Sequence, residues 1–330
     1  MRTTVGVCED AARAVLETCG MPRENARISA RAIVLAEVWG VASHGLLRLP
    51  HYVRRLRAGG YNARALLRVV ADRGAVVSYD GEGGLGHWQA WRAAKKGVER
   101  ARRHGVGVTA VGNSGHCGAL GIYTLPAIRA EMLSIVLSNG PAVMPAWGGS
   151  TPLLSTSPLA VGIAQGEQRL MVDMATSSVA RGKIAAYAAR GEPLPEGWAL
   201  SGQGEPTTDA QAALSGMLAP MGGAKGFALA LVVEALTGGL VGPNRSTEVA
   251  DMFDPSDDAR PQGLSHTVVT IDPGSLDVDG RASSRLDALF GAVEKTGGHL
   301  PGSGRRDPDT VSSAEEIEVD DALAADVLGL

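Results

Sequence analysis

The chain has 330 residues, 45% of them apolar and 4% aromatic, and its formal net charge is −4. That size suffices for one large or two ordinary hydrophobic cores, and the acidic balance gives no electrostatic reason to expect a nucleic-acid ligand. At the start of the chain, acidic residues precede any hydrophobic stretch, and no apolar run approaches the roughly 20 residues of a membrane helix. The three cysteines are widely spaced and predict neither a disulfide framework nor a zinc site. We therefore expect a cytoplasmic globular protein without a metal or a membrane partner.

The first 70 residues predict a helical segment. Apolar residues recur at spacings of three and four over 9–19 and 24–39, as they do on the buried face of a helix. A third helix is expected from Gly45 to about Arg57, because the pair Gly59-Gly60 follows it as a stop signal.

The pattern changes after residue 70, where short apolar runs alternate with helical stretches and predict an α/β body over 71–300. Strands are expected at 75–79, 107–111, 133–137, 159–164, 170–172 and 267–271, and helices at 87–104, 119–131 and 224–240. The polar segment 244–262 is interpreted as a variable loop that says little about substrate. A third segment, 301–330, predicts a polar turn and a closing helix with Leu323, Val327 and Leu328 on its apolar side.

One motif suggests a dinucleotide-binding loop. Residues Gly81-Glu82-Gly83-Gly84-Leu85-Gly86 match G-x-G-x-x-G between an expected strand and an expected helix. However, the next strand ends in Gly112-Asn113 and lacks the acid that would bind a ribose hydroxyl in a Rossmann fold. We therefore interpret these six residues as a tight turn into a helix.

Two short stretches each place a histidine among small residues and hydroxyls. The first contains Ser43, His44 and Arg48, and the second runs from Gly112 to Gly118 around His116. The pKa of histidine lies near neutrality, and arginine can hold a carboxylate with two parallel hydrogen bonds. If the first stretch is helical, His44 and Arg48 share a face. This predicts a site that holds a carboxylate and moves a proton beside it; the alternative is an ordinary His and Arg on a helix surface.

Lysine is scarce, since only five lysines stand among 31 basic residues. One of them, Lys225, lies in the glycine-rich turn Pro220–Gly226. Its compact charge could meet a phosphate or a ribose hydroxyl. The alternative is a solvated turn lysine.

Many short motifs together resemble those of the malate/L-lactate dehydrogenase family, which includes ureidoglycolate, sulfolactate and diketogulonate oxidoreductases and cyclic ketimine reductases. The resemblance runs the whole chain. It is carried by Ser43-His44-Gly45 with Arg48 and Tyr52, Asn113-Ser114-Gly115-His116, Ser138-Asn139-Gly140-Pro141, Val172-Asp173-Met174-Ala175-Thr176-Ser177, Pro206-Thr207-Thr208-Asp209, Gly222-Gly223-Ala224-Lys225-Gly226 and Pro301-Gly302.

The resemblance implies a mixed-sheet, non-Rossmann dehydrogenase fold and a cytoplasmic homodimer. It further implies NAD- or NADP-dependent interconversion of a small 2-hydroxy acid and its 2-oxo acid. His44 and His116 would be catalytic, and family members differ over which one is the acid/base. By similarity, the carboxylate substrate would be bound by Ser43, Arg48 and Tyr52, and the cofactor by Asp173, Met174, Ala175, Thr176, Ser177, Lys225, Gly226, Pro301, Gly302 and Ser303.

One departure from the family pattern concerns the Gly-Thr-Asn-Pro motif, which reads Ser155-Thr156-Ser157-Pro158 in this chain. A hydroxyl has fewer donors and less reach than an amide, so a contact made there would change. Two other functions stay open beside the hydroxy-acid dehydrogenase. They are an NADPH-dependent reductase of cyclic ketimine carboxylates and a non-catalytic nucleotide-binding relative. The intact His44, Arg48 and His116 argue against the latter.

Overall fold

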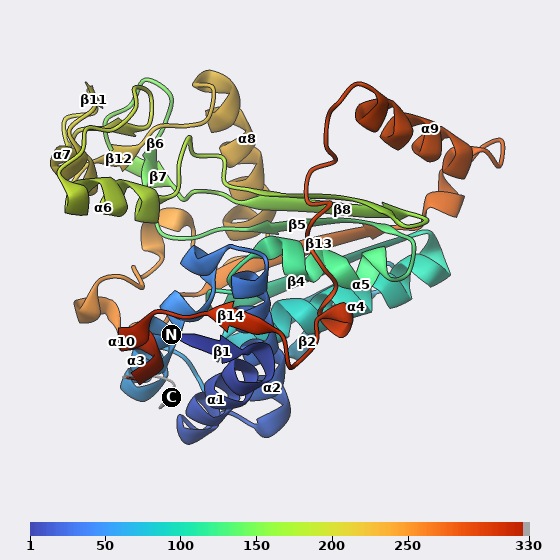
Figure 1. Ribbon diagram of the computed structural model, residues 1–330, viewed down its shortest axis with the longest axis horizontal. Coiled ribbons are helices and arrows are strands. Elements are labelled where there is room, and N and C mark those ends of the chain that lie inside the picture. The colour runs from blue at the N-terminus through green and yellow to red at the C-terminus, as the bar shows by residue number, and fades with distance from the viewer. Residues whose placement is uncertain (326–330) are drawn as a thin grey trace.

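A seven-stranded mixed sheet forms the centre of the computed structural model, which describes residues 1–325 (Figure 1). Its strand order is β2-β3-β4-β13-β5-β8-β9; β3 and β4 are parallel, and the other neighbouring pairs are antiparallel. This confirms the α/β fold and the six expected strands, to which the structure adds β2. The strands are β2 Arg68–Arg73, β3 Val76–Gly84, β4 Val106–Ser114, β5 Leu133–Ser138, β8 Leu159–Gln165, β9 Gln168–Met174 and β13 Leu264–Ile271.

Helices cover both faces of this sheet (Figure 1). On one face lie α4 (Gly86–His104) and the short α5 (Leu125–Ile128), whose apolar side chains share a core with β5, β8 and β13. On the other face lie α8 (Ala224–Glu234) and α9 (Ala282–Lys295). Phe290 of α9 packs against Ile163 of β8, and Thr267 Oγ1 donates to the carbonyl of Leu236 just after α8.

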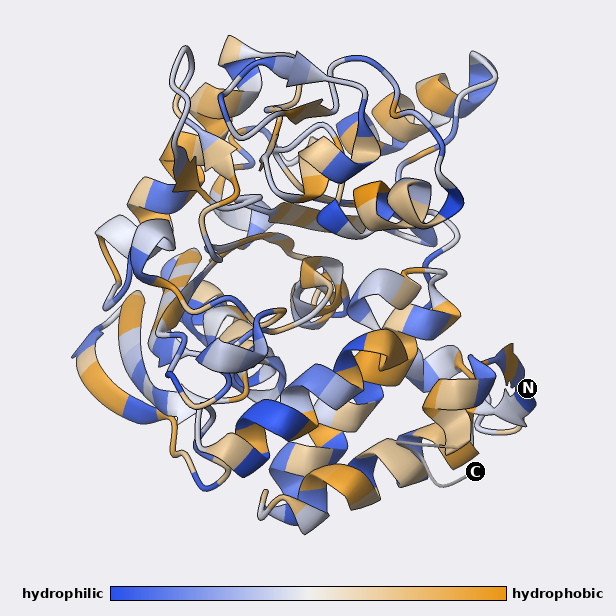
Figure 2. Cartoon of the chain, turned by 90° about the vertical axis from the view of Figure 1, so that its left-hand side faces the viewer, coloured by the Kyte–Doolittle hydropathy of each residue, from blue (hydrophilic) through white to orange (hydrophobic). Residues whose placement is uncertain are grey.

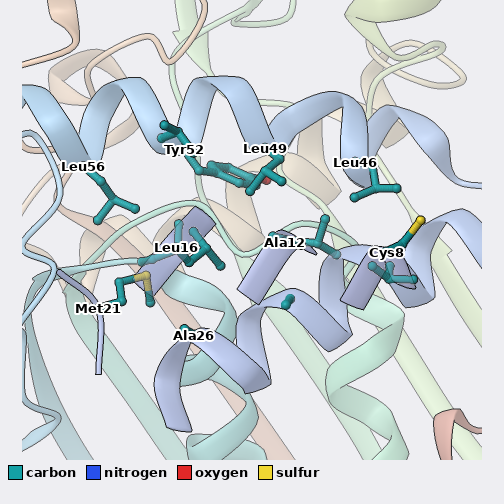
Figure 3. Packing of buried hydrophobic residues seen from close by; sticks show 14 of the residues in the cluster. Cys8, Ala12, Leu16, Met21, Ala26, Leu46, Leu49, Tyr52 and Leu56 are labelled. Atoms are coloured by element: carbon teal, nitrogen blue, oxygen red, sulfur yellow. The ribbon is translucent and has the colours of Figure 1, made fainter. Parts of the chain in front are cut away.

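The N-terminal helices α1 (Val5–Thr18), α2 (Arg23–Val38) and α3 (Leu49–Ala58) form a second core. Figure 3 shows Leu46, Leu49, Tyr52 and Leu56 pointing from α3 and the turn before it toward Cys8, Ala12 and Leu16 of α1. These residues recur at spacings of three and four, as one buried helix face requires. The expectation that the third helix begins at Gly45 is wrong, because α3 begins at Leu49 after two short 3-10 turns, η1 (Ala42–His44) and η2 (Leu46–Arg48).

Two other expected helices differ from the structure. The stretch 119–131 is a 3-10 turn, η3 (Leu120–Thr124), followed by α5, since Pro126 has no N–H to continue a longer helix ladder. The stretch 224–240 ends as an α-helix at Glu234 and widens into the turn η4 (Ala235–Gly239). Smaller elements near α8 are β6 Met144–Pro145, β7 Pro152–Leu154, α6 Arg181–Arg190, β10 Ala199–Leu200, β11 Pro206–Thr207, α7 Ala210–Leu214 and β12 Met217–Leu218.

The C-terminal segment returns to the N-terminal helices. Strand β14 (Glu316–Glu318) pairs with β1 (Arg2–Thr4), and Leu323 of α10 (Asp321–Leu323) is buried in the same core as α1. Val327 and Leu328, which we expected in the closing helix, lie outside the described residues. The helices show apolar and polar bands side by side in Figure 2. Within residues 1–325, no helix combines the length and the apolar content needed to cross a membrane.

Candidate active site

A pocket of about 350 Å³ collects side chains from distant parts of the sequence. The N-terminal segment contributes the turn before α3, and the body contributes the loop after β4 and the end of β9. The C-terminal segment contributes one arginine. Predicted site residues that line the pocket are Ser43, His44, Arg48, His116, Asp173, Met174 and Ala175, together with the unpredicted Arg181, Phe253, Gln262 and Arg305.

Tight turns place His44 and Arg48 in the pocket, rather than one face of an α-helix as expected. The N–H of Leu46 donates to Glu37 Oε1 of α2 over 2.6 Å, which fixes the turn at its middle. Gly45 has no room for a side chain, because a Cβ there would lie 2.5 Å from Glu37 Oε1. The Arg48 Nε donates to the Ser43 carbonyl over 2.6 Å, so both ends of the turn are connected.

His44 is a neutral imidazole at pH 7. Burial, and secondarily the positive charge of Arg48, lower the pKa of His44 to about 4. Its Nδ1 lies 3.0 Å from Ser43 Oγ, and its ring stacks on His116 with centroids 5.9 Å apart. The two histidines that the sequence singled out therefore face the same pocket as a stacked pair.

His116 is the second ring of this stack, and in the described structure its ring has two hydrogen-bond partners where that of His44 has one. Its Nδ1 is 2.8 Å from the hydroxyl of Tyr52 and accepts the Gly118 N–H over 3.2 Å. Burial, followed by the neighbouring His44 and His87, lowers the pKa of His116 well below its usual range. Tyr52 itself is fully buried and contacts His116 from behind instead of lining the pocket.

Two guanidinium groups approach the same aromatic ring on the pocket wall. The guanidinium carbon of Arg48 lies 4.5 Å from the ring centroid of Phe253, and that of Arg181 lies 5.9 Å from it. Arg181 is also paired with Asp251 over 2.9 Å. The interpretation of 244–262 as uninformative is wrong, since Met252, Phe253 and Gln262 line the pocket.

Three of the predicted cofactor segments meet around the end of β9. The Met171 N–H donates to the Pro301 carbonyl over 2.7 Å, which holds Pro301-Gly302-Ser303 against this strand. The Met221 N–H donates to the Thr176 carbonyl over 2.9 Å, which holds the turn before Lys225 beside Asp173–Ser177. Of these residues only Asp173, Met174 and Ala175 line the pocket. Thr176 and Ser177 are buried just past it, and Lys225 is exposed at the start of α8, next to the buried Gly226.

The glycine motif at 81–86 forms the last four residues of β3, the linking Leu85 and the first residue of α4, so most of it is strand and not the expected tight turn. Protein groups crowd three of its four glycines, Gly81, Gly84 and Gly86. A Cβ at Gly81 or Gly84 would lie 2.4 Å from the side-chain amide of Gln89. The Gly86 N–H at the start of α4 donates to the His116 carbonyl over 3.2 Å. The protein's own groups therefore fill the position that phosphates take in a Rossmann fold.

Comparisons with known proteins identify the family of this chain. The family model described as malate/L-lactate dehydrogenase matches residues 5–328. The chain belongs to the malate/L-lactate dehydrogenase family. It is 39% identical to a (2R)-3-sulfolactate dehydrogenase (NADP(+)) from Chromohalobacter salexigens, covering 96% of this chain and 93% of that protein. It is 34% identical to a Δ1-pyrroline-2-carboxylate reductase from Ancylobacter novellus, covering 96% and 94%.

Solved structures of this family share the fold. The sulfolactate dehydrogenase from Methanocaldococcus jannaschii matches with a TM-score of 0.90 at 29% identity, covering 100% of this chain and 98% of that one. A Δ1-piperideine-2-carboxylate reductase from Pseudomonas syringae also gives a TM-score of 0.90, at 28% identity, and covers 100% and 99%. The non-Rossmann dehydrogenase fold expected from the resemblance is thereby confirmed.

The loop that departs from the family motif is buried in part. Ser155, Thr156 and Pro158 line the pocket, whereas Ser157 is fully buried and does not. Ser157 has φ 40°, a left-handed conformation that asparagine, the residue expected from the family, adopts more readily than serine. Its N–H donates to Ser155 Oγ over 2.9 Å, and its hydroxyl donates to the Ser155 carbonyl. The substitution therefore affects the shape of the loop rather than a direct pocket contact.

Proposed function

We propose that this member of the malate/L-lactate dehydrogenase family interconverts a small 2-hydroxy acid and its 2-oxo acid with NAD or NADP. The observation that carries the proposal is the meeting of His44, His116 and Arg48 in one pocket with the end of β9. A neutral imidazole can accept a proton, and arginine binds carboxylates. A nicotinamide supplies or accepts the hydride when it is bound.

Each side chain has a separate role in this reaction. Arg48 holds the carboxylate of the substrate, so that the carbon to be reduced is fixed relative to both histidines. In the oxidation, neutral His44 takes the proton of the substrate hydroxyl, and in the reduction the protonated ring returns it to the oxygen. Ser43 supports the His44 ring through its hydroxyl.

The residues around the end of β9 fit a cofactor that carries phosphates. Arg305 Nη1 is buried without a hydrogen-bond partner among residues 1–325 and lies 3.7 Å from Asp173 Oδ2. A buried donor without an acceptor costs free energy, and a phosphate oxygen would satisfy it. Asp173–Ser177, Lys225-Gly226 and Pro301–Ser303 would hold the remainder of the cofactor.

The pocket favours a substrate with a second acidic group. Arg181 and Arg48 both contact the ring of Phe253, so their guanidinium groups lie close enough to bind the two ends of one small substrate. Arg48 binds the carboxylate next to the reacting carbon, and Arg181 binds a carboxylate or sulfonate at the other end of the substrate. Relatives named as sulfolactate and malate dehydrogenases take substrates of this kind.

A reductase of cyclic ketimine carboxylates is the second candidate, because relatives named as pyrroline- and piperideine-carboxylate reductases match over nearly the whole chain. Such a substrate has one acidic group and leaves Arg181 without a ligand. The discriminating experiment follows nicotinamide absorbance with sulfolactate, malate and lactate as alcohols and with Δ1-pyrroline-2-carboxylate as imine, each with both cofactors. We expect sulfolactate or malate to be turned over fastest. Exclusive turnover of the imine would replace the lead proposal by the second candidate.

An arginine pair tests the second-acid contact. Arg181→Ala should raise KM for malate or sulfolactate at least tenfold, as expected for loss of a charge-assisted hydrogen bond, and leave KM for lactate nearly unchanged. Arg190→Ala is the matched control, since Arg190 lies at the exposed end of the same helix and pairs with Glu192. Equal effects of Arg181→Ala on all substrates would contradict the contact.

We also propose that the protein is a cytoplasmic homodimer. Support for an interface comes from apolar side chains exposed on and after α8, where Leu231, Val232 and Leu240 are 47%, 54% and 78% exposed. Free thiols at Cys8, Cys19 and Cys117 are consistent with a reducing compartment. Sedimentation of the active protein at micromolar concentration should show a dimer, and cell fractionation should recover it with cytoplasmic markers. A stable, active monomer would refute the proposed homodimer.

A further inference from the structure

Hydrogen bonds to protein groups hold both the backbone and the ring of His116. Its own N–H donates to Gln262 Oε1 over 3.1 Å, and its carbonyl accepts from Gly86. On the ring, Nδ1 lies within hydrogen-bond distance of both the Gly118 N–H and the Tyr52 hydroxyl. Nε2 is therefore the ring nitrogen that remains for a ligand in the pocket.

The partners of Nδ1 determine which nitrogen carries the proton. A backbone N–H can only donate, so Nδ1 of His116 accepts and the neutral ring has its hydrogen on Nε2. The Tyr52 hydroxyl, fully buried and with no second hydrogen-bond partner in the described part of the chain, then donates to Nδ1 as well. A second proton on this ring would face the Gly118 N–H.

Gly118 has to be glycine for this arrangement. Its φ is +71°, and a Cβ would lie 2.8 Å from Nε2 of the buried His87. Any other residue would move the N–H away from the His116 ring. The local backbone is thus shaped around a histidine that accepts at Nδ1.

His44 has a different partner. Its Nδ1 faces the Ser43 hydroxyl, which can donate or accept by rotating about its C–O bond. His44 can therefore carry its hydrogen on either nitrogen and can hold two protons without opposing a fixed donor. Only one of the two stacked rings has the freedom that an acid/base needs.

We propose that Tyr52 is a positioning residue that, with Gly118, fixes His116 in the Nε2–H tautomer, so that His116 donates a hydrogen bond to the reacting oxygen and His44 alone exchanges the proton. This rests on the proposed hydroxy-acid chemistry. In the oxidation, the hydroxyl proton moves to His44, and a bound nicotinamide would accept the hydride that leaves the same carbon. The Nε2–H of His116 stays where it is and stabilises the charge that develops on the oxygen.

The first test needs no substrate. Long-range proton–nitrogen NMR of histidine-labelled protein, assigned with His116→Gln, should show His116 only as the Nε2–H tautomer. In Tyr52→Phe, which keeps the ring that packs in the core, the Nδ1 signal should move toward that of a ring nitrogen without a hydrogen bond. A His116 that carries hydrogen on Nδ1, or exchanges between tautomers, would overturn the proposal even if the protein turned over no hydroxy acid.

The second test compares glutamine and alanine at each histidine. Glutamine can donate a hydrogen bond but cannot exchange a proton near neutrality, so His116→Gln should keep at least about tenfold more kcat than His116→Ala. His44→Gln should be as inactive as His44→Ala. The reverse pattern would show that His116 is the acid/base and would overturn the proposal.

A double-mutant cycle shows whether Tyr52 acts through His116. Tyr52→Phe should lower kcat about tenfold, the scale of one hydrogen bond, with little change in the cofactor KM. In the His116→Gln background the same change should alter kcat less than about twofold. An equal loss in both backgrounds would mean that Tyr52 has only a general structural role, and the proposal would fall.

Discussion

Arg48 is fixed on two sides before any substrate arrives. Its Nε donates to the Ser43 carbonyl, and its guanidinium carbon lies 4.5 Å from the ring centroid of Phe253. A lysine keeps the positive charge but has neither the planar guanidinium nor its paired hydrogen bonds to a carboxylate. A change from arginine to lysine at this position therefore tests the shape of the side chain while the charge stays the same.

Arg48→Lys should reduce kcat/KM for the 2-oxo acid by roughly 1–3 kcal/mol of transition-state binding, the range for a hydrogen bond to a charged group. Steady-state kinetics with the best substrate of the panel measures this. Because Arg48 is proposed to contact only the substrate, the cofactor KM should stay nearly constant. A loss in cofactor binding as large as the loss in substrate binding would contradict the assignment.

Lys225→Ala should raise the Michaelis constant of the cofactor more than that of the substrate. Lys225 lies in the turn tied to Thr176, on the proposed cofactor side, and not among the residues of the substrate pocket. Gly83→Ala is the control, because Gly83 belongs to the glycine motif that we exclude from phosphate binding and has open space around it. It strains a residue with φ +71° but should leave cofactor affinity unchanged. Equal effects of Lys225→Ala on both Michaelis constants would refute the proposed contact between Lys225 and the cofactor.

Chemistry-bearing residues that stand in distinctive local settings could be predicted from the sequence. His44, Arg48, His116 and Asp173 all belong to short motifs, and the structure brings them to one pocket. Arg181 and Phe253 could not be found in this way. Both lie in segments without a distinctive motif, and only their packing against Arg48 across the fold gives them a place at the site.

At the scale of elements, the turn before α3 shows how a tertiary contact overrides a local pattern. The apolar spacing around Leu46 and Leu49 fits a helix from Gly45, but Glu37 of α2 accepts the Leu46 N–H and stops the helix short of it. Helices α6 and α9 were not predicted, because α6 has only Ile184 and Ala188 buried and α9 only Phe290. Strands in the middle of the sheet, by contrast, are apolar enough to be recognised.

Glu37→Ala should loosen this turn. The Leu46 N–H would lose its acceptor, which costs roughly 1–3 kcal/mol of unfolding free energy, and kcat should fall because His44 is no longer held. Glu37→Gln keeps an oxygen that can accept and should retain most of both quantities. Thermal unfolding and steady-state kinetics on the two variants provide the comparison. A Glu37→Gln variant as impaired as Glu37→Ala would show that the charge, and not the hydrogen bond, is needed.

At the scale of the whole molecule, the pocket draws on all three predicted segments: His44 from 1–70, Asp173 from 71–300 and Arg305 from 301–330. The pairing of β1 with β14 returns the last segment to the first. The division of the chain at these boundaries stays a prediction. Because each of the three segments contributes a side chain to the pocket, the site is incomplete if any one segment is missing.

Four histidines, of which His87 and His266 are buried and His44 and His116 half-buried, make the stability of that fold depend on pH. Burial lowers the pKa of His44 to about 4, of His87 to about 3 and of His266 to about 4, and it also lowers the pKa of His116 well below its usual range. In the unfolded chain the same groups titrate near the ordinary value of 6.5. Below that pH the unfolded state binds more protons than the folded state, so acid favours unfolding.

The free energy of unfolding should therefore be constant with pH above about 7 and fall steeply between about pH 6.5 and pH 5. Each histidine contributes about 1.4 kcal/mol per pH unit once its unfolded form is protonated, so four give a slope of up to about 5 kcal/mol per pH unit. Burial raises the pKa of Asp173 and Glu37, so these carboxyls bind protons in the folded state before the unfolded state and oppose this trend as the pH falls through their raised pKa. Denaturant unfolding at a series of pH values measures the slope.

His87→Leu isolates one proton of this total. Both ring nitrogens of His87 are buried without a hydrogen-bond partner in the described structure, so an apolar side chain of similar size loses no hydrogen bond. The slope should fall by about 1.4 kcal/mol per pH unit, and stability near pH 5 should rise relative to stability at pH 8. An unchanged slope would mean that His87 is protonated in the folded protein. A charged His87 would disfavour a second proton on the neighbouring His116 still further, so these rings would hold one charge in the folded protein while His116 stays neutral.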